Sequence, residues 1–201
     1  MRRLAALAFA ALAALPAAAQ EFAGLDIGRP LFDARALGLP ISQGYVGGYQ
    51  VQKWARANGV ELSVTGVPNG QIVYMESFPG PTTPAIPGEG LRFKVTSMGE
   101  AIRMLGGPGF YFTGRGPMAT TGGNDVWFHS YSLQDRPDVI VTFAFAAPVS
   151  VRGFNPDGTQ IPNENALLES MIVADYAYQL SIWGGEAVAR PGYQQINLNY
   201  R

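Results

Sequence analysis

TSMGEAIRMLGGP, which spans Thr96–Pro108, carries the start and stop signals of one short helix. Ser97 and Glu100 hold the capping-box positions, in which the Ser side chain accepts a backbone N–H and the Glu side chain reaches back. Glycines follow at the end of the stretch, and Pro108 prevents the helix from continuing. One apolar face recurs at helical spacing between these signals and consists of Met98, Ala101, Ile102 and Leu105.

A weaker copy of this pattern, Gly28–Pro40, stands 68 positions earlier in the chain. The two stretches align without gaps, so that Leu-Gly-x-Pro ends both of them. The same alignment pairs Ile72-Val73 with Ile140-Val141, and each of these pairs follows a turn. This agreement predicts an internal duplication; the alternative is that two similar units arose by chance.

Strand-like segments follow each predicted helix. The turn signals Asn58-Gly59 and Pro68-Asn69-Gly70 separate alternating segments in the first half of the chain, whereas Gly44–Gly48 reads as a loop. Asn163–Trp183 is then expected to be the longest helix, because apolar residues recur in it at helical spacing. Its expected buried stripe is formed by Leu168, Ile172, Tyr176, Gln179 or Leu180, and Trp183.

The predicted fold class is therefore α+β: two tandem helix-plus-antiparallel-meander units with an added C-terminal helix. We expect a signal peptide over 1–20, a first unit over 21–77, a Pro/Gly-rich linker over 78–90, and a second unit over 91–147. The remaining residues, 148–201, are expected to hold a loop, the long helix and an edge strand at Tyr193–Tyr200.

The first residues have the three parts of a secretory signal. Arg2 and Arg3 supply a positive start, Leu4–Leu15 is apolar, and the small residues Ala17–Ala19 indicate cleavage near Ala19 or Gln20. The apolar run is shorter than the roughly 20 residues that span a bilayer, and no later segment is a transmembrane candidate. We therefore expect a periplasmic or secreted protein.

The composition excludes several classes of function. The chain has no Cys, so it has no disulfide and no cysteine for a lipid anchor, and its single His excludes the usual zinc sites. Its 14 Lys and Arg residues are scattered and do not outnumber its 15 Asp and Glu residues, which argues against nucleic acid as a partner. No motif for a metal or another cofactor is present, so none is expected.

Aromatic residues are the best candidates for a binding site. Trp127, His129 and Tyr131 alternate along one predicted strand and share one face, and Trp54 lies on another strand. Trp and Tyr dominate binding hot spots, so this row predicts a partner-binding patch if the face is exposed; the alternative is that the face belongs to the core. Ser130 points to the opposite face, which argues against a Ser–His catalytic pair, and no catalytic residue is predicted.

A helix that ends in Leu-Gly-x-Pro and leads into antiparallel strands resembles the repeat unit of the β-lactamase-inhibitor-protein-like fold. It is also similar to the small outer-membrane assembly lipoproteins of the SmpA/OmlA type. The matching residues are Leu37–Pro40 and Leu105–Pro108. The resemblance implies a periplasmic binding or assembly role, and it transfers no functional residue because the shared residues only end helices.

The function predicted from these observations is that of an exported, non-enzymatic periplasmic protein. It would bind a protein or a component of the cell envelope through its β-sheet face. The alternative is a periplasmic hydrolase or carbohydrate-active enzyme whose site has no recognisable motif.

Overall fold

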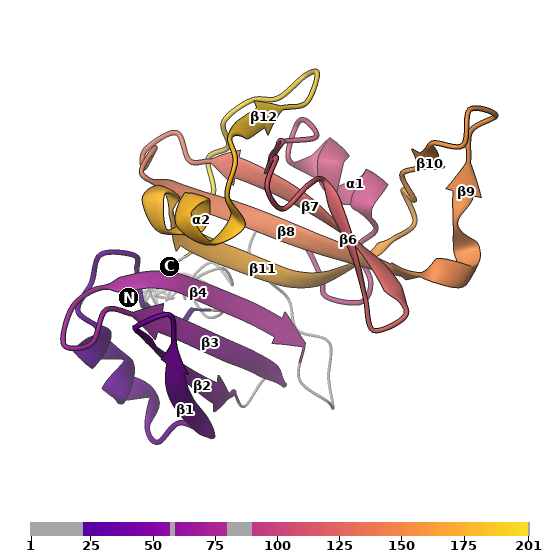
Figure 1. Ribbon diagram of the computed structural model, residues 1–201. Helices are drawn as coiled ribbons and strands as arrows, with labels where there is room; N and C mark the ends of the chain where they lie inside the picture. Colours follow the sequence, from indigo (N-terminus) through magenta and orange to yellow (C-terminus); the bar gives the residue numbers. More distant parts are fainter. Residues whose placement is uncertain (1–21, 57–58, 80–89, 201) are drawn as a thin grey trace, which may run out of the picture.

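The main element of the structure is one ten-stranded β-sheet (Figure 1). The computed structural model describes residues 22–56, 59–79 and 90–200. The strands of the sheet are β1 Ser42–Val46, β2 Tyr49–Ala55, β3 Val60–Gly66, β4 Ile72–Pro79, β5 Phe110–Phe112, β6 Met118–Thr121, β7 Asn124–Ser132, β8 Val139–Pro148, β11 Leu167–Asp175 and β12 Ala187–Ala189. Their spatial order is β1-β2-β3-β4-β11-β8-β7-β5-β12, with β6 paired to β7, and every pairing among them is antiparallel.

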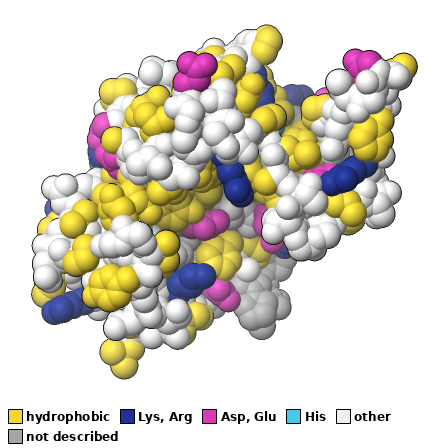
Figure 2. Space-filling view, in the orientation of Figure 1, with side chains coloured by type: hydrophobic (Ala, Val, Ile, Leu, Met, Phe, Trp, Pro, Cys, Tyr) yellow, Lys and Arg dark blue, Asp and Glu magenta, His cyan; other side chains and the backbone are white. Residues whose placement is uncertain are grey.

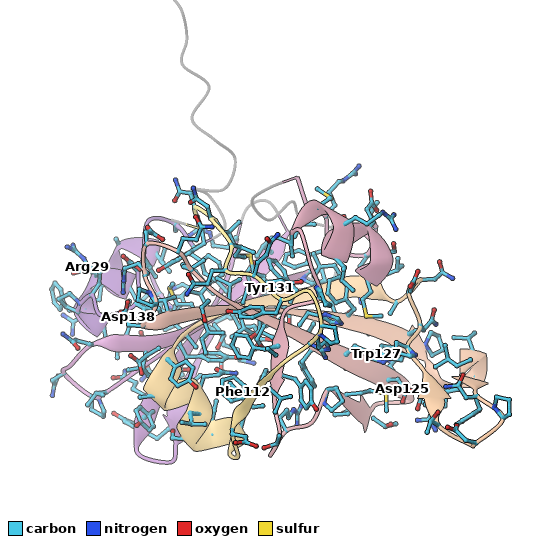
Figure 3. All side chains as sticks on the ribbon, turned by 90° about the horizontal axis from the view of Figure 1, so that it is seen from above. Arg29, Phe112, Asp125, Trp127, Tyr131 and Asp138 are labelled. Carbon is cyan, nitrogen blue, oxygen red and sulfur yellow. The ribbon has the colours of Figure 1, made fainter. Side chains whose placement is uncertain are left out.

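Short helices cover both faces of this sheet. The 3-10 helix η2, Leu31–Leu37, and the α-helix α1, Met98–Met104, lie on one face, and α2, Tyr176–Trp183, lies on the other (Figure 3). The expected cap of α1 is confirmed, since the Ser97 side chain accepts a hydrogen bond from the backbone N–H of Glu100 at 3.3 Å. None of the helices in the described part of the chain has the length and apolar character needed to span a bilayer.

The expectation of two tandem α+β units with an added C-terminal helix is wrong. Residues 163–183 do not form one long helix, because Leu167–Asp175 form β11, which inserts between β4 and β8 and joins both halves of the chain into one sheet. Ser170–Ala174 are all buried, as in a strand that is covered on both faces. Helix α2 begins only after Asp175, whose carboxylate accepts the backbone N–H of Tyr178 at 2.8 Å.

Other expectations can be placed on the same structure. The turn at 68–70 is confirmed between β3 and β4, whereas Gly44 lies in β1, and only Gly47 and Gly48 form the turn expected over 44–48. The signal peptide, most of the 78–90 linker and Asn58 lie outside the described residues. The internal duplication stays a prediction.

The main core lies on the face that carries η2 and α1. Its members come from both halves of the sheet and from both helices, including Leu62, Met75, Met98 and Phe143. A second, smaller cluster lies under α2 on the opposite face and is formed by Phe110, Phe112, Ile140, Tyr176, Leu180, Trp183 and Tyr193. The sheet is thus buried on both sides near its centre.

A short arm projects from the end of β8 (Figure 1). It consists of the 3-10 turn η3, Val149–Val151, and a two-stranded hairpin of β9, Gly153–Phe154, and β10, Gln160–Ile161. An isolated two-stranded hairpin is only marginally stable in water, so the arm needs an anchor. That anchor is the fully buried carboxylate of Asp125 on β7.

Asp125 receives hydrogen bonds from both ends of the hairpin. Arg152 donates Nε and Nη2 at 2.6 and 2.5 Å, and Gln160 donates Nε2 at 2.9 Å. Thr120 of β6 adds a hydroxyl donor at 2.7 Å. The Arg152 guanidinium holds the pKa of the Asp125 carboxyl well below its usual range, so the carboxylate remains charged and paired.

We predict that Asp125→Asn loosens the arm without unfolding the sheet. The amide cannot accept the paired Arg152 donors as the carboxylate does, so the hairpin opens more often. Limited proteolysis with mass spectrometry should show faster cleavage between residues 153 and 161. Asp33→Asn, which removes an exposed ion pair with Arg29, is the matched control. An unchanged rate of cleavage in the arm would show that Asp125 is not its anchor.

Gly109, just before β5, shows how closely α1 is joined to the sheet. Its φ is +68°, and a Cβ at this position would lie 2.4 Å from the carbonyl oxygen of Ser130 and about 3 Å from the Tyr131 ring. Only glycine satisfies both conditions.

We therefore predict that Gly109→Ala destabilises the protein far more than Gly122→Ala. Gly122 also has a positive φ, +56°, but a Cβ there meets no atom within 4 Å. Gly122→Ala should lose only about 1–2 kcal/mol of stability, which is the cost of a left-handed backbone at a residue with a Cβ. Urea unfolding measures both losses, and equal losses would contradict the close contact at Gly109.

Candidate partner-binding surface

The four aromatic and histidine residues singled out in the sequence lie in the core. The exposed fractions are 6% for Trp127, 5% for His129, 0% for Tyr131 and 3% for Trp54. Trp127 and Tyr131 belong to the main core, on the face of the sheet that carries α1 (Figure 3). These side chains do not form the expected exposed row. They are buried, as the alternative interpretation holds.

Two members of the row hold the glycine-rich loop that ends α1. The Tyr131 hydroxyl donates to the carbonyl of Gly107 at 2.7 Å, and His129 Nδ1 lies 2.7 Å from the carbonyl oxygen of Pro108. Arg190 donates to the same Pro108 carbonyl at 3.2 Å. The carbonyls of Gly107 and Pro108 belong to the loop that follows α1, and these three side chains supply their hydrogen-bond partners.

Burial fixes the protonation of His129. It lowers the pKa of the His129 imidazole from 6.5 to about 4, and the nearby positive charge of Arg190 acts in the same direction. The ring is therefore neutral at pH 7, and its Nδ1–H donates to the Pro108 carbonyl. A buried neutral ring that is held by a structural hydrogen bond is not placed to act as a general base toward a substrate.

We predict that the stability of the protein falls as the pH is lowered from 6.5 to 4, because of His129. The unfolded chain binds a proton on this ring below pH 6.5, while the folded chain resists it until about pH 4, so stability falls as the pH falls through this window. The loss should approach about 3 kcal/mol near pH 4.

The measurement is urea unfolding of the wild type and of His129→Phe at several pH values. Carboxylates change little above pH 5, so the part of the slope between pH 6.5 and 5 belongs mainly to the single histidine. The Phe variant should lose this slope even if its stability is lower at every pH. A variant that keeps the slope would contradict the assignment.

The better candidate surface lies on the opposite side of the sheet. Strands β2, β3 and β4 present half of their side chains to the face that carries α2, and we call this part of the sheet the open face. The register places Lys53 opposite Ser63 and Ser63 opposite Glu76. The neighbouring row runs across the same three strands through Val51, Thr65 and Tyr74. Ser63 and Thr65, in the middle of the two rows, are buried. The side chains at the ends of the rows are half-buried: Lys53, Glu76, Val51 and Tyr74.

Tyrosines gather where the open face meets α2. The Tyr178 ring of α2 makes edge contacts with the rings of Tyr49 and Tyr74, at centroid distances of 4.8 and 6.1 Å. The Tyr74 hydroxyl donates to Glu76 at 2.9 Å. Burial, with the Glu76 charge beside it, raises the pKa of Tyr74 well above 10, so this hydroxyl keeps its proton. The cluster therefore combines apolar rings with fixed polar groups.

Two cations border the same surface. Lys53 Nζ lies 5.6 Å from the centre of the Phe78 ring, and Arg115 lies over the rings of Phe128 and Trp183 at 4.7 and 6.0 Å. Neither cation forms an ion pair with a described carboxylate. Figure 2 shows a hollow beside α2 in which hydrophobic side chains lie together with Lys or Arg and Asp or Glu side chains.

The open face suits binding through aromatic, hydroxyl and charged contacts. Lys53 and Arg115 are available for acidic groups, the tyrosine rings for apolar or stacked groups, and Glu76 for a donor. No group of three or more His, Asp or Glu side chains that could hold a metal ion occurs within residues 22–56, 59–79 and 90–200.

Sequence reasoning did not find this surface. The useful signal is the alternation of Tyr49, Val51 and Lys53 along β2, which places them on the face of the strand that Trp54 does not occupy. It did not say which side of the strand would be covered.

Comparisons with known proteins show no family for this chain. The sequence matches no protein-family model, and a search of curated proteins gives no match. Among solved structures, a cysteine-rich secretory protein from Staphylococcus aureus aligns over 90% of this chain and 54% of its own, with 11% identity and a TM-score of 0.43. The chain thus spans about half the length of that protein, and the likeness is too low to support an inference.

Proposed function

We propose that the protein is an exported, non-enzymatic binding protein that holds a protein or cell-envelope partner against the open face. The signal-like first residues support export. The open face supports binding, because it combines tyrosine rings, the fixed Tyr74 hydroxyl and two cations that form no ion pair with a described carboxylate. The binding residues of this proposal replace Trp127, His129, Tyr131 and Trp54, which are buried.

The observation that carries the proposal is the tyrosine cluster at the edge of α2. Tyr49, Tyr74 and Tyr178 come from three different elements and meet on one side of the sheet. Each ring is only half-buried, so part of its surface remains available to a partner. Tyrosine contributes large contact area at low conformational cost, which explains its enrichment in interfaces.

The predicted partner carries groups that complement the two cations. Lys53 and Arg115 flank the aromatic cluster, so acidic groups on the partner would pair with them while its apolar part contacts the rings. Such charges mainly set the association rate and the choice of partner, whereas the rings supply affinity. Binding should therefore weaken, but not disappear, when salt is raised.

A photo-crosslinking amino acid at Val51 tests this surface in cells that express the full chain. Val51 belongs to the open-face row that runs through Thr65 to Tyr74, beside the row that ends at Glu76. We expect a discrete crosslinked product with the exported protein. Adding Tyr178→Ala should reduce its yield at least tenfold, because truncating a hot-spot aromatic commonly costs 2 kcal/mol or more, which is about a thirtyfold change in affinity.

The matched control places the same crosslinker at Phe154, which is 57% exposed on the arm. Circular dichroism must show that Tyr178→Ala remains folded. Equal products from both positions, or a product at Val51 that Tyr178→Ala leaves unchanged, would argue against the open face as the binding surface.

A further inference from the structure

Strand β1 is an open edge of the sheet without the usual protection against pairing. It ends the strand order, and all five of its residues, Ser42–Val46, are exposed. Edge strands are normally protected by charged residues, proline, a bulge or a cover, or by being very short. The sequence SQGYV has no charge and no proline, whereas the opposite edge strand, β12, is only three residues long.

The turn after β1 determines which of its main-chain groups face outward. Gly47 and Gly48 have φ values of +56° and +86°, as in a type I′ turn. Such a two-residue turn makes Val46 and Tyr49 a hydrogen-bonded pair. Hydrogen-bonded and non-bonded pairs alternate along antiparallel strands, so Gly44 bonds Val51 and the main-chain groups of Gln43 and Tyr45 point away from β2.

The side chains of β1 divide between the two faces in the same register. Gln43 and Tyr45 lie opposite Gln52 and Gln50, on the side of the main core. Gly44 lies opposite Val51 and therefore on the side of the open face. Large apolar side chains are also exposed beside this edge, at fractions of 94% for Leu39, 61% for Ile41 and 70% for Tyr45.

We propose that β1 pairs with β1 of a second copy of this chain to form a two-fold dimer. In the antiparallel register centred on Gly44, the outward main-chain groups of Gln43 meet those of Tyr45 in the other copy. The outward main-chain groups of Tyr45 meet those of Gln43 in the same way. This arrangement forms two hydrogen-bonded pairs around the axis, with four main-chain hydrogen bonds. The central Gly44 pair has no side chains and permits the close approach of non-bonded positions.

The same strand properties favour a second copy over an unrelated extended peptide. The register is self-complementary, as a two-fold interface requires, and a neutral strand offers no charge by which to select a foreign partner. Pairing also covers part of Tyr45 and the neighbouring Ile41. Because paired antiparallel strands keep their faces aligned, the two open faces would become one continuous surface.

A cysteine scan tests the register directly, because the chain contains no Cys. Gly44→Cys should form a disulfide-linked dimer under mild oxidation, since the two central residues face each other. Val46→Cys is the matched control: the same register places the two copies of residue 46 about 13 Å apart along the strands. Equal crosslinking at both positions, or none at Gly44→Cys, would overturn the proposed register.

Sedimentation and light scattering test association without a crosslink. The wild type should change from monomer to dimer as its concentration rises. Gln43→Pro removes only an outward N–H, so it should keep the β1–β2 ladder and raise the dimer dissociation constant at least tenfold. Tyr45→Lys should act in the same way, while Phe154→Lys on the arm should not.

A wild type that stays monomeric up to several hundred micromolar would overturn the proposal, as would a dimer that Gln43→Pro leaves unchanged. Circular dichroism of Gln43→Pro checks that the sheet is intact. The result is independent of the proposed function, because the Val51 crosslink reports on the open face and these variants alter only the edge.

Discussion

The pairing of β11 with both β4 and β8 is the constraint on which the rest of the structure depends. Eight residues of β11 pair with β8, and four of these also pair with β4. Without β11, β1–β4 and β5–β8 would be two separate sheets, each with an exposed inner edge. The residues that close the sheet come late in the chain, so its centre cannot form until almost the whole chain is available. Pairings of such long sequence separation also make folding slow.

The position of β11 also decides which surfaces remain open. Helix α2 follows β11 directly and packs beside it, so it covers the sheet over β8 and leaves the open face over β2, β3 and β4. The tyrosine cluster forms at this border because Tyr178 of α2 reaches Tyr49 and Tyr74. The candidate surface is therefore a result of the same connection that unites the sheet. Its position next to the free β1 edge would let a dimer extend it.

Buried polar groups in this protein mainly join elements together. His129, Tyr131 and Arg190 satisfy carbonyls of the loop that ends α1, and Asp125 joins the arm to β7 through Arg152. In each case a polar side chain inside the protein supplies a partner that water cannot supply there. The only histidine, which looks chemically distinctive in the sequence, has a structural role for this reason.

The sequence by itself determined features that depend on neighbouring residues. The cap at Ser97, the glycine stop after α1 and the turn at 68–70 follow from local backbone preferences, and all three occur. The expected helix over 163–183 is wrong, because a mainly apolar strand that is buried on both faces also satisfies a helical spacing. Only the tertiary structure decided that Trp127, His129 and Tyr131 face the core and that Tyr74 and Glu76 face a partly open surface. Alternation along a strand separates two faces, but their exposure depends on which distant elements pack against each one.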